Sequence, residues 1–514
     1  MKARIKRQRS NCKRRLQKLL RNAKQRIRHR LRKKQWDEQR RPMFQKRNIH
    51  YDLADKTKGL RCAGLGVFLL LVQRLGLTAA LNAKLHLLQR HVPYFESDHV
   101  LNLAYNLLVG GKTINDLELL RNDETYLHLL NAQRIPDPTT AGDFLRRFAA
   151  DDIEQLMDVI NSKRLLVWQQ QPEAFLEQAI IEGDGSIVET TGQCKQGMDI
   201  SYNGKWGYHP LLVSLANTQE PLFVFNRSAN RPSHEGAAGY FDRAVRLCQQ
   251  ARFRKILLRG DTDFSQTAYL DGWDAAGVGF VFGLDATRTL KAKAQAVPER
   301  TWRPLQRPPR YQVATTIRER PANVKDEVVQ RRGFRKVRLL GEDVAALVYR
   351  PVACGQDYMV VVVRKHLLWE QRGQPSEAET RYFFYITNQW RWTDAEVVYF
   401  ANDRCNQENL IQQLKNGVRA LRAPVNTLAA NWAYMVIGCL AWSMKAWLGL
   451  VQPKSEQARQ LLTMEYRKFL DAIMLLPCQI VTTGGRLVVR LLQWNPWVKM
   501  LCQASELLRE LRFG

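Results

Sequence analysis

The chain has 514 residues, enough for about three domains of ordinary size, so a single small binding module is excluded. Hydrophobic residues make up 45% and aromatic residues 9%, which is enough for packed cores and excludes disorder of the whole chain. Lys and Arg number 79 against 49 Asp and Glu, and the net charge of +30 predicts a polyanionic partner. Nucleic acid is favoured over an anionic membrane surface.

Residues 1–60 form a basic arm. The first 50 residues hold 21 Lys or Arg and only two acids, so they carry a charge of +19. Six apolar side chains recur at helical spacing within this arm: Leu16, Leu19, Leu20, Ala23, Ile27 and Leu31. The pattern predicts a basic amphipathic helix that could lie on nucleic acid, on a membrane surface or against a partner. Met43 lies beyond this predicted helix and is an alternative start of the chain.

Residues 61–172 have the apolar periodicity of helices. The segment PDPTTAGDFLRRF, from Pro136 to Phe148, places turn residues and a Thr cap before a helix with paired arginines. Helix packing without DNA would give a similar pattern. The basic composition of the chain favours a helical DNA-binding domain over residues 61–172.

The pattern changes after Pro172. Short β-rich runs alternate with helical stretches over residues 173–285, which predicts an α/β sheet. Residues 286–380 are rich in Arg and Pro and then in strand-like runs, which predicts a β-rich insertion. Residues 381–450 read as a helical continuation of the α/β part, and residues 451–514 as a C-terminal helical region that could serve dimerisation.

One stretch is long enough to cross a membrane. Ala423–Met444 has 22 residues without a charge, but Pro424, Asn426, Asn431 and Ser443 lie within it, so we expect a buried core helix. No apolar segment of a signal peptide follows the basic N-terminus. Nine scattered cysteines without zinc-type spacing predict free thiols in a reducing compartment, so we expect a cytoplasmic protein without membrane partners.

Two aspartates end apolar runs in the α/β part. Asp184 follows the run in QAIIEGD and Asp261 follows KILLRGD, so both carboxylates are predicted at the carboxyl ends of strands, where α/β sheets place their sites. Each alone could be a loop-capping residue. The acids Glu182, Asp263 and Asp285 lie near the same strand ends and compete for the assignment.

A third acid lies on a predicted helix that begins with the capping box Thr393 to Glu396. At about 100° per residue, Arg404, Glu408 and Lys415 fall within roughly 40° of one another on this helix. An isolated helix with this pattern could simply hold a surface pair between Arg404 and Glu408.

Three carboxylates on converging elements would suit Mg²⁺, which prefers few protein oxygens and leaves positions for water and phosphate. Two such ions, with Mn²⁺ able to substitute, would serve phosphodiester chemistry, and Arg404 and Lys415 would suit the phosphates.

The set Asp184, Asp261 and Glu408 resembles the catalytic acids of the group 1 DDE transposases of bacterial insertion sequences. The segment R-CNQ-E-NLIQQL-K, from Arg404 to Lys415, is similar to the Tyr-x-x-Arg-x-x-x-Glu-x-x-x-x-x-x-Lys signature of that family. Ala401 occupies the Tyr position. The segments GDGSIVETTGQ, GYHPLL, NRSAN, RGDTDF and ITN fit the same family, and the resemblance covers residues 61 to 450.

The resemblance implies a ribonuclease H-like core interrupted by a β-rich insertion, and cut-and-paste transposition at terminal inverted repeats with joining to target DNA. It implies Asp184, Asp261 and Glu408 as catalytic residues and ligands of two Mg²⁺ ions. Its implied phosphate or DNA contacts are Arg404, Lys415, Arg259, Arg227 and Asn230. A homodimer that holds two double-stranded DNA ends follows from the same function.

Trp390 and Trp392 stand between the ITN segment and the capping box, where an indole could stack on an extruded base, although core packing is the commoner fate of a tryptophan. Two other functions stay open. One is a DNA-binding protein, derived from a transposase, that has lost catalysis, and the other is a metal-dependent nuclease without strand transfer.

Overall fold

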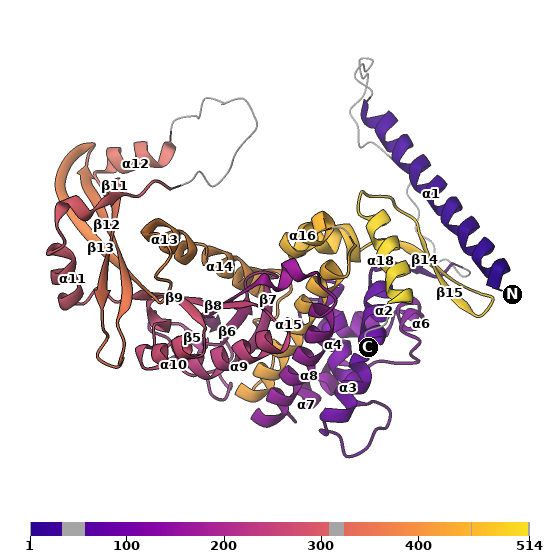
Figure 1. Ribbon diagram of the computed structural model, residues 1–514. Coiled ribbons are helices and arrows are strands. Elements are labelled where there is room, and N and C mark those ends of the chain that lie inside the picture. Colours follow the sequence, from indigo (N-terminus) through magenta and orange to yellow (C-terminus); the bar gives the residue numbers. More distant parts are fainter. Residues whose placement is uncertain (1, 33–56, 308–322, 454, 512–514) are drawn as a thin grey trace. The chain divides into compact units, whose positions relative to one another are not determined.

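The computed structural model describes residues 2–32, 57–307, 323–453 and 455–511 (Figure 1). The chain divides into two compact units. The first combines Met1–Gln170 with Gln413–Gly514, and the second is Gln171–Gln412. The N-terminal and C-terminal helical regions therefore belong to one unit. Met43 lies outside the described residues.

The first unit is mainly helical. Its N-terminal helices are α1 (Lys2–Arg32), α2 (Leu65–Leu75), α3 (Leu77–Lys84), α4 (Glu96–Leu108), α5 (Leu117–Arg121), α6 (Glu124–Leu130), α7 (Pro138–Leu145) and α8 (Ala150–Trp168). Its C-terminal helices are α15 (Leu428–Leu450), α16 (Ser455–Thr463), α17 (Tyr466–Phe469) and α18 (Val498–Glu510). The amphipathic helix predicted in the basic arm is present as α1, and Asp137 caps α7 by accepting from the Thr140 N–H.

Helix α15 forms the centre of this unit and packs against α4, α8 and α16. It is long and apolar enough to cross a membrane, and its apolar window is fully buried within the structure. Helices α2 and α3 pass the same test only as a pair bent by 58°. Burial on all sides by protein explains why α15 is apolar all round, as expected for a core helix. The helix begins five residues later than the uncharged stretch suggested, after Thr427 caps it, and it includes the buried Lys445.

A small sheet links the two ends of the chain within this unit. Strand β1 (Gly59–Leu60) pairs with β14 (Cys478–Thr483), which forms an antiparallel hairpin with β15 (Arg486–Leu491). Residues near position 60 and near position 480 are thereby fixed together.

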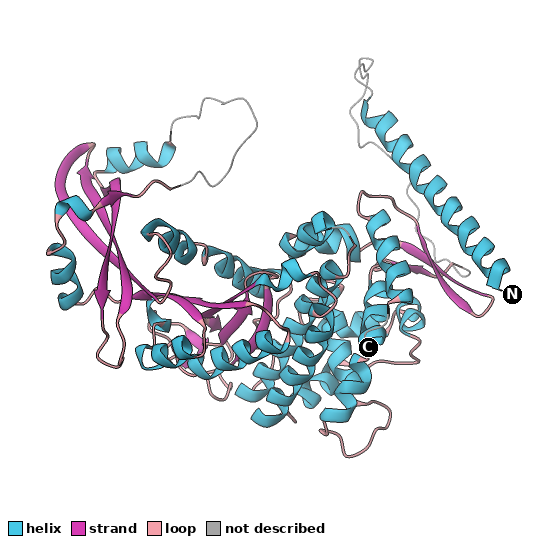
Figure 2. Ribbon diagram, viewed as in Figure 1, coloured by secondary structure: helices cyan, strands magenta, loops and turns pink. Residues whose placement is uncertain are grey.

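The second unit contains a nine-stranded mixed sheet, drawn in magenta in Figure 2. In chain order its strands are β2 (Gln178–Gly185), β6 (Leu211–Leu215), β7 (Glu220–Phe225), β8 (Lys255–Gly260), β9 (Gly279–Leu284), β10 (Arg303–Pro304), β11 (Arg335–Tyr349), β12 (Tyr358–Gln371) and β13 (Gln374–Thr387). Their spatial order is β10-β11-β12-β13-β9-β8-β2-β6-β7. Strands β2, β8 and β9 run parallel to one another, and the other pairings are antiparallel. The predicted α/β class is confirmed.

Two helices, α9 and α13, pack on the sheet on either side of strand β8 in the strand order. Helix α9 (Ala237–Gln250) packs on β2 and β6, and α13 (Asp394–Asn402) packs on β9 and on β11 to β13. Val397 and Val398 of α13 are fully buried against a valine-rich cluster that includes Val361 and Val363 of β12. The long strands β11 to β13 continue the core sheet because β13 pairs with β9. The helix that follows β13 is thereby anchored beside the parallel strands.

Candidate active site

Asp184 and Asp261 lie at the same edge of the sheet. Asp184 is the penultimate residue of β2, and Asp261 directly follows β8. The two strands are parallel neighbours, so their carboxyl ends meet at one edge, as the sequence predicted. The Asp261 carboxylate also accepts a hydrogen bond from the Asp263 N–H at 3.1 Å, which fixes its backbone in a tight turn.

Glycines beside both aspartates allow close packing at this edge. A Cβ on Gly183 would lie 2.6 Å from the Phe241 ring, and a Cβ on Gly260 would lie 2.7 Å from Cβ of Phe264. Both distances are shorter than real Cβ contacts. The motifs Gly183-Asp184 and Gly260-Asp261 therefore bring the strand ends under aromatic side chains with no room for a larger residue.

A buried ion pair joins the two strands two residues before the aspartates. Glu182 and Arg259 are opposite each other in the parallel register, and they are 1% and 2% exposed. The Arg259 Nε donates to the Glu182 carboxylate at 2.8 Å, and its Nη1 donates to the carbonyl oxygen of Phe400 at 2.6 Å. The guanidinium also lies over the Phe400 ring, 4.7 Å from its centroid. One arginine thus fixes both aspartate strands to the end of α13.

The family resemblance implied a contact between Arg259 and a DNA phosphate, and in this structure the guanidinium is directed towards Glu182 and the Phe400 carbonyl. The side chain is buried and bound by Glu182 and Phe400, so its role in this structure is to brace the strands. The sequence contains a signal of this pairing: the motifs EGD and RGD place opposite charges at the same distance before each aspartate. A charge inside an otherwise apolar strand requires a buried partner, and that rule could have identified both Glu182 and Arg259.

The helix that carries the third acid is interrupted. The capping box is present, with the Thr393 N–H donating to Glu396 at 2.7 Å, but α13 ends at Asn402 and α14 (Cys405–Gln412) begins after a turn. The Asn402 side chain donates to the Val398 carbonyl, and the Arg404 N–H bonds to the Ala401 carbonyl in a tighter turn. The expectation of one continuous helix is therefore wrong, because local hydrogen bonds replace the regular pattern at residues 402–404.

Helix α14 is attached to the sheet by Gln407. This side chain is 1% exposed, and its amide nitrogen lies 3.4 Å from both the Leu212 carbonyl and the Ser214 hydroxyl on β6. Leu212 is the register partner of Asp184. The contact therefore fixes the first turn of α14, which carries Glu408, near the end of β2.

Arg404 brings the three predicted acids together. Its Nη1 donates to the Asp261 carboxylate at 2.8 Å and lies 3.8 Å from the Asp184 carboxylate. Its Nη2 lies 3.6 Å from the Glu408 carboxylate. All four side chains lie in the second unit. Residues separated by more than 220 positions thus converge on one guanidinium.

Burial and mutual charge shift the pKa values of Asp184, Asp261 and Arg404. Burial raises the pKa of Asp184 to about 7, and Asp261 adds to this shift while Arg404 opposes it. Burial also raises the pKa of Asp261, again against the effect of Arg404. Burial disfavours the charge of Arg404, but the three carboxylates together raise its pKa above the ordinary value. Perturbed carboxylates of this kind are typical of functional sites.

The donor atoms suit a divalent cation, but their present arrangement is built around Arg404. Three carboxylates are the hard oxygen ligands that Mg²⁺ or Mn²⁺ prefers. Within the described ranges, no cluster of three or more His, Cys, Asp or Glu side chains could hold a metal ion as it stands. The chemistry of the ligands therefore fits, whereas the space between them is taken by a guanidinium.

The remaining predicted contacts are dispersed. Arg227 is buried, and its guanidinium donates to the carbonyls of His209, Pro232, Ser233 and Glu235. Asn230 is exposed on that segment. Lys415 lies in the π-helical turn Gln413–Gly417 and belongs to the first unit.

The two tryptophans differ. Trp390 is 51% exposed. Trp392 packs edge-on against Phe400, with ring centroids 5.1 Å apart, and contacts the valine-rich cluster. Only Trp390 of this pair presents a largely exposed indole. The competing acid Asp285 is exposed after β9, and Asp263 is exposed beside Asp261.

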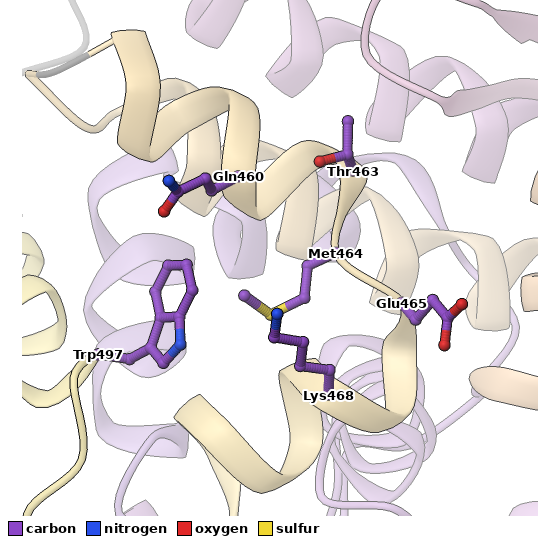
Figure 3. Close-up of a pocket in the computed structure, with 6 residues that line it drawn as sticks. All are labelled: Gln460, Thr463, Met464, Glu465, Lys468 and Trp497. Atoms are coloured by element: carbon purple, nitrogen blue, oxygen red, sulfur yellow. The ribbon is translucent and has the colours of Figure 1, made fainter. Parts of the chain in front are cut away.

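A pocket in the first unit has a different character. It encloses about 570 Å³ and is lined by Gln460, Thr463, Met464, Glu465, Lys468 and Trp497 (Figure 3). The indole of Trp497 and the Met464 side chain form its apolar walls, while Lys468 and Glu465 bring opposite charges. None of the predicted site residues lines it, and a single carboxylate does not match the chemistry assigned above.

The family model described as the transposase DDE domain, group 1, matches residues 61–323, just over half of the chain. The chain belongs to this transposase family. Asp184 and Asp261 lie inside the matched range, whereas Arg404 and Glu408 lie beyond it. Family membership therefore bears on the two strand aspartates, and the third acid depends on the geometry around Arg404.

Two further comparisons add little. A solved structure described as the cryo-EM structure of the piggyBac transposase synaptic complex with hairpin DNA is 12% identical, with a TM-score of 0.35. The match covers 80% of this chain and 81% of that chain, but this TM-score is too low to establish a shared fold. No curated protein matches the chain.

Proposed function

We propose that the chain binds the terminal inverted repeats of an insertion sequence and catalyses metal-dependent strand cleavage and strand transfer in a cut-and-paste reaction. Membership of the DDE transposase family supports the class of reaction. The observation that carries the proposal is the convergence of Asp184, Asp261 and Glu408 on Arg404 at one edge of the sheet.

We further propose that the core is ribonuclease H-like. The strand order β7-β6-β2-β8-β9, with three parallel strands flanked by an antiparallel pair, supports this assignment. Helix α9 lies between β7 and β8 in the chain and covers β2 and β6. The strands β10 to β13 would then form the insertion between β9 and the helix of the third acid.

In the proposed site, Asp184, Asp261 and Glu408 would hold divalent ions. When bound, such ions favour deprotonation of an attacking oxygen and stabilise the leaving oxygen. In cleavage a water oxygen attacks phosphorus, the P–O3′ bond breaks, and the 3′ oxygen leaves as a hydroxyl. In transfer that 3′-hydroxyl attacks a target phosphodiester, and the target 3′ oxygen leaves.

The chain itself would supply orientation and charge. Asp184 and Asp261 are fixed by their strands, and the partly exposed Arg404 could turn towards a phosphate of the bound DNA. Lys415 and Asn230 are proposed as further DNA contacts, and the exposed Trp390 as a platform for an unstacked base. A homodimer in the cytoplasm would hold the two DNA ends.

The test uses the purified full chain, labelled DNA from the regions that flank its coding sequence, target DNA and Mg²⁺. Joined product supports the transposase, and its absence contradicts the proposal. Cut ends alone would indicate a metal-dependent nuclease. Salt-sensitive binding with neither product would indicate a DNA-binding protein that has lost catalysis.

A further inference from the structure

Arg404 stands where the three carboxylates converge, and it neutralises only part of their charge. One guanidinium faces Asp184, Asp261 and Glu408, so three ionised carboxylates with one arginine would carry a charge of about −2. Such a group attracts a further cation. A divalent ion that reached the same carboxylates would repel the guanidinium at short range.

The contacts of Arg404 permit its release. Its hydrogen bond to Asp261 at 2.8 Å is short, but the distances of 3.8 Å to Asp184 and 3.6 Å to Glu408 exceed those of direct hydrogen bonds. The side chain is 21% exposed, and the residue lies in the turn between α13 and α14. Rotation of this side chain therefore leaves both helices intact.

Arg259 shows the opposite arrangement on the neighbouring residues. Its side chain is 3% exposed, and it is bound by one carboxylate and one carbonyl. Removal of that guanidinium would leave Glu182 buried and unpaired. Two arginines at one sheet edge thus differ: Arg259 is fixed, whereas Arg404 is held by partners that a metal ion could take over.

We propose that Arg404 is an exchangeable internal cation: in the metal-free chain it holds Asp184, Asp261 and Glu408 together, and divalent ions displace it when they bind. The inference rests on the proposed function, because it takes the three acids as the metal ligands. Its consequence is that Arg404 competes with metal and lowers the metal affinity of the chain. The displaced guanidinium is then free for a phosphate.

The test measures Mn²⁺ binding to the full chain without DNA, from the paramagnetic resonance signal of the free ion. We expect Arg404→Gln to bind Mn²⁺ about tenfold more tightly at this site, because a competing positive charge is gone. Arg404→Lys should stay close to the parent. Arg254→Gln is the matched control, since Arg254 also lies against two carboxylates, Glu173 and Glu177, in the same unit.

Equal or weaker Mn²⁺ affinity in a folded Arg404→Gln variant would overturn the inference, and circular dichroism checks that the variant is folded. A Glu408→Gln variant separates this result from the proposed function. If Glu408→Gln weakens Mn²⁺ binding while Arg404→Gln leaves it unchanged, only the exchange fails. If Glu408→Gln has no effect, the assignment of the metal ligands fails as well, and both proposals fall.

Discussion

Two of the arginine–carboxylate groups in the second unit lie only two positions apart along strands β2 and β8. We call Arg259 and Glu182 the lower group: both side chains are buried, one cation pairs with one carboxylate, and Arg259 also bonds to the Phe400 carbonyl. We call Arg404 and its three carboxylates the upper group, in which the arginine is partly exposed. The balanced charges of the lower group suit a rigid structure, whereas the excess negative charge of the upper group suits exchange of ligands. Adjacent positions on the same strands can thus serve structure and chemistry separately.

The largest effect should come from the upper group. Glu408→Gln removes one of the proposed metal ligands, and we expect DNA cleavage to fall by about a thousandfold or more while DNA binding is retained. Cleavage of labelled end DNA at fixed Mg²⁺ measures this. Glu377→Gln is the matched control, because Glu377 is as exposed as Glu408 and also pairs with an arginine. Cleavage by Glu408→Gln at the rate of this control would remove Glu408 from the site.

Substitutions in the lower group should change the free energy of unfolding. Arg259→Met leaves the Glu182 carboxylate buried without its partner, and we expect the free energy of unfolding to fall by about 3–5 kcal/mol. Urea unfolding followed by circular dichroism measures it. The double change Glu182→Leu with Arg259→Met should recover most of the loss, since both charges are gone. Arg404→Gln should change stability by no more than about 1 kcal/mol. An equal loss of unfolding free energy in Arg259→Met and Arg404→Gln would contradict the difference between the two groups.

Lys445 in the first unit is a buried cation of a different kind, because its hydrogen-bond partner is a neutral carbonyl and not a carboxylate. It is 1% exposed, its Nζ donates to the Leu462 carbonyl at 3.1 Å, and burial lowers its pKa to about 7. Between pH 7 and the ordinary lysine value, the unfolded chain binds more protons than the folded chain, so this group makes stability rise with pH.

We therefore expect Lys445→Met to raise the free energy of unfolding by about 2–4 kcal/mol at pH 6.5, and by much less at pH 10. Thermal melts of parent and variant at both pH values measure the difference. A gain that does not depend on pH would show that the charge of Lys445 is not the cause.

The smallest effects concern the two tryptophans beside α13. Trp390→Ala should leave stability within about 0.5 kcal/mol of the parent, because the indole is exposed, yet weaken DNA cleavage by about tenfold if a base stacks on it. Trp392→Ala should reduce stability by about 2 kcal/mol through lost packing on Phe400. If Trp390→Ala cleaves DNA as well as the parent, the stacking proposal fails.

Sequence reasoning reached the strand aspartates because a carboxylate after an apolar run is a local signal, and parallel strands align their carboxyl ends. The capping box at Thr393 was equally local. The break in the helix after Asn402 could not be predicted from periodicity. It depends on the hydrogen bond from the Asn402 side chain to the Val398 carbonyl and on the hydrogen bond from Arg404 to Asp261. The pairing of Arg259 with Glu182, 77 positions away, was not predicted, although a charge within each apolar strand is a signal of such a pair. Whether a charged side chain is buried depends on partners such as this one, which are distant in the sequence.

The most direct test of the site compares two aspartates that follow neighbouring parallel strands. Asp261 follows β8 and bonds to Arg404, whereas Asp285 follows β9 and is exposed. Cleavage of labelled end DNA with Mg²⁺ is measured for Asp261→Asn and Asp285→Asn. The site around Arg404 predicts that Asp261→Asn abolishes cleavage and that Asp285→Asn retains it. Loss of cleavage in Asp285→Asn with activity retained in Asp261→Asn would contradict the assignment.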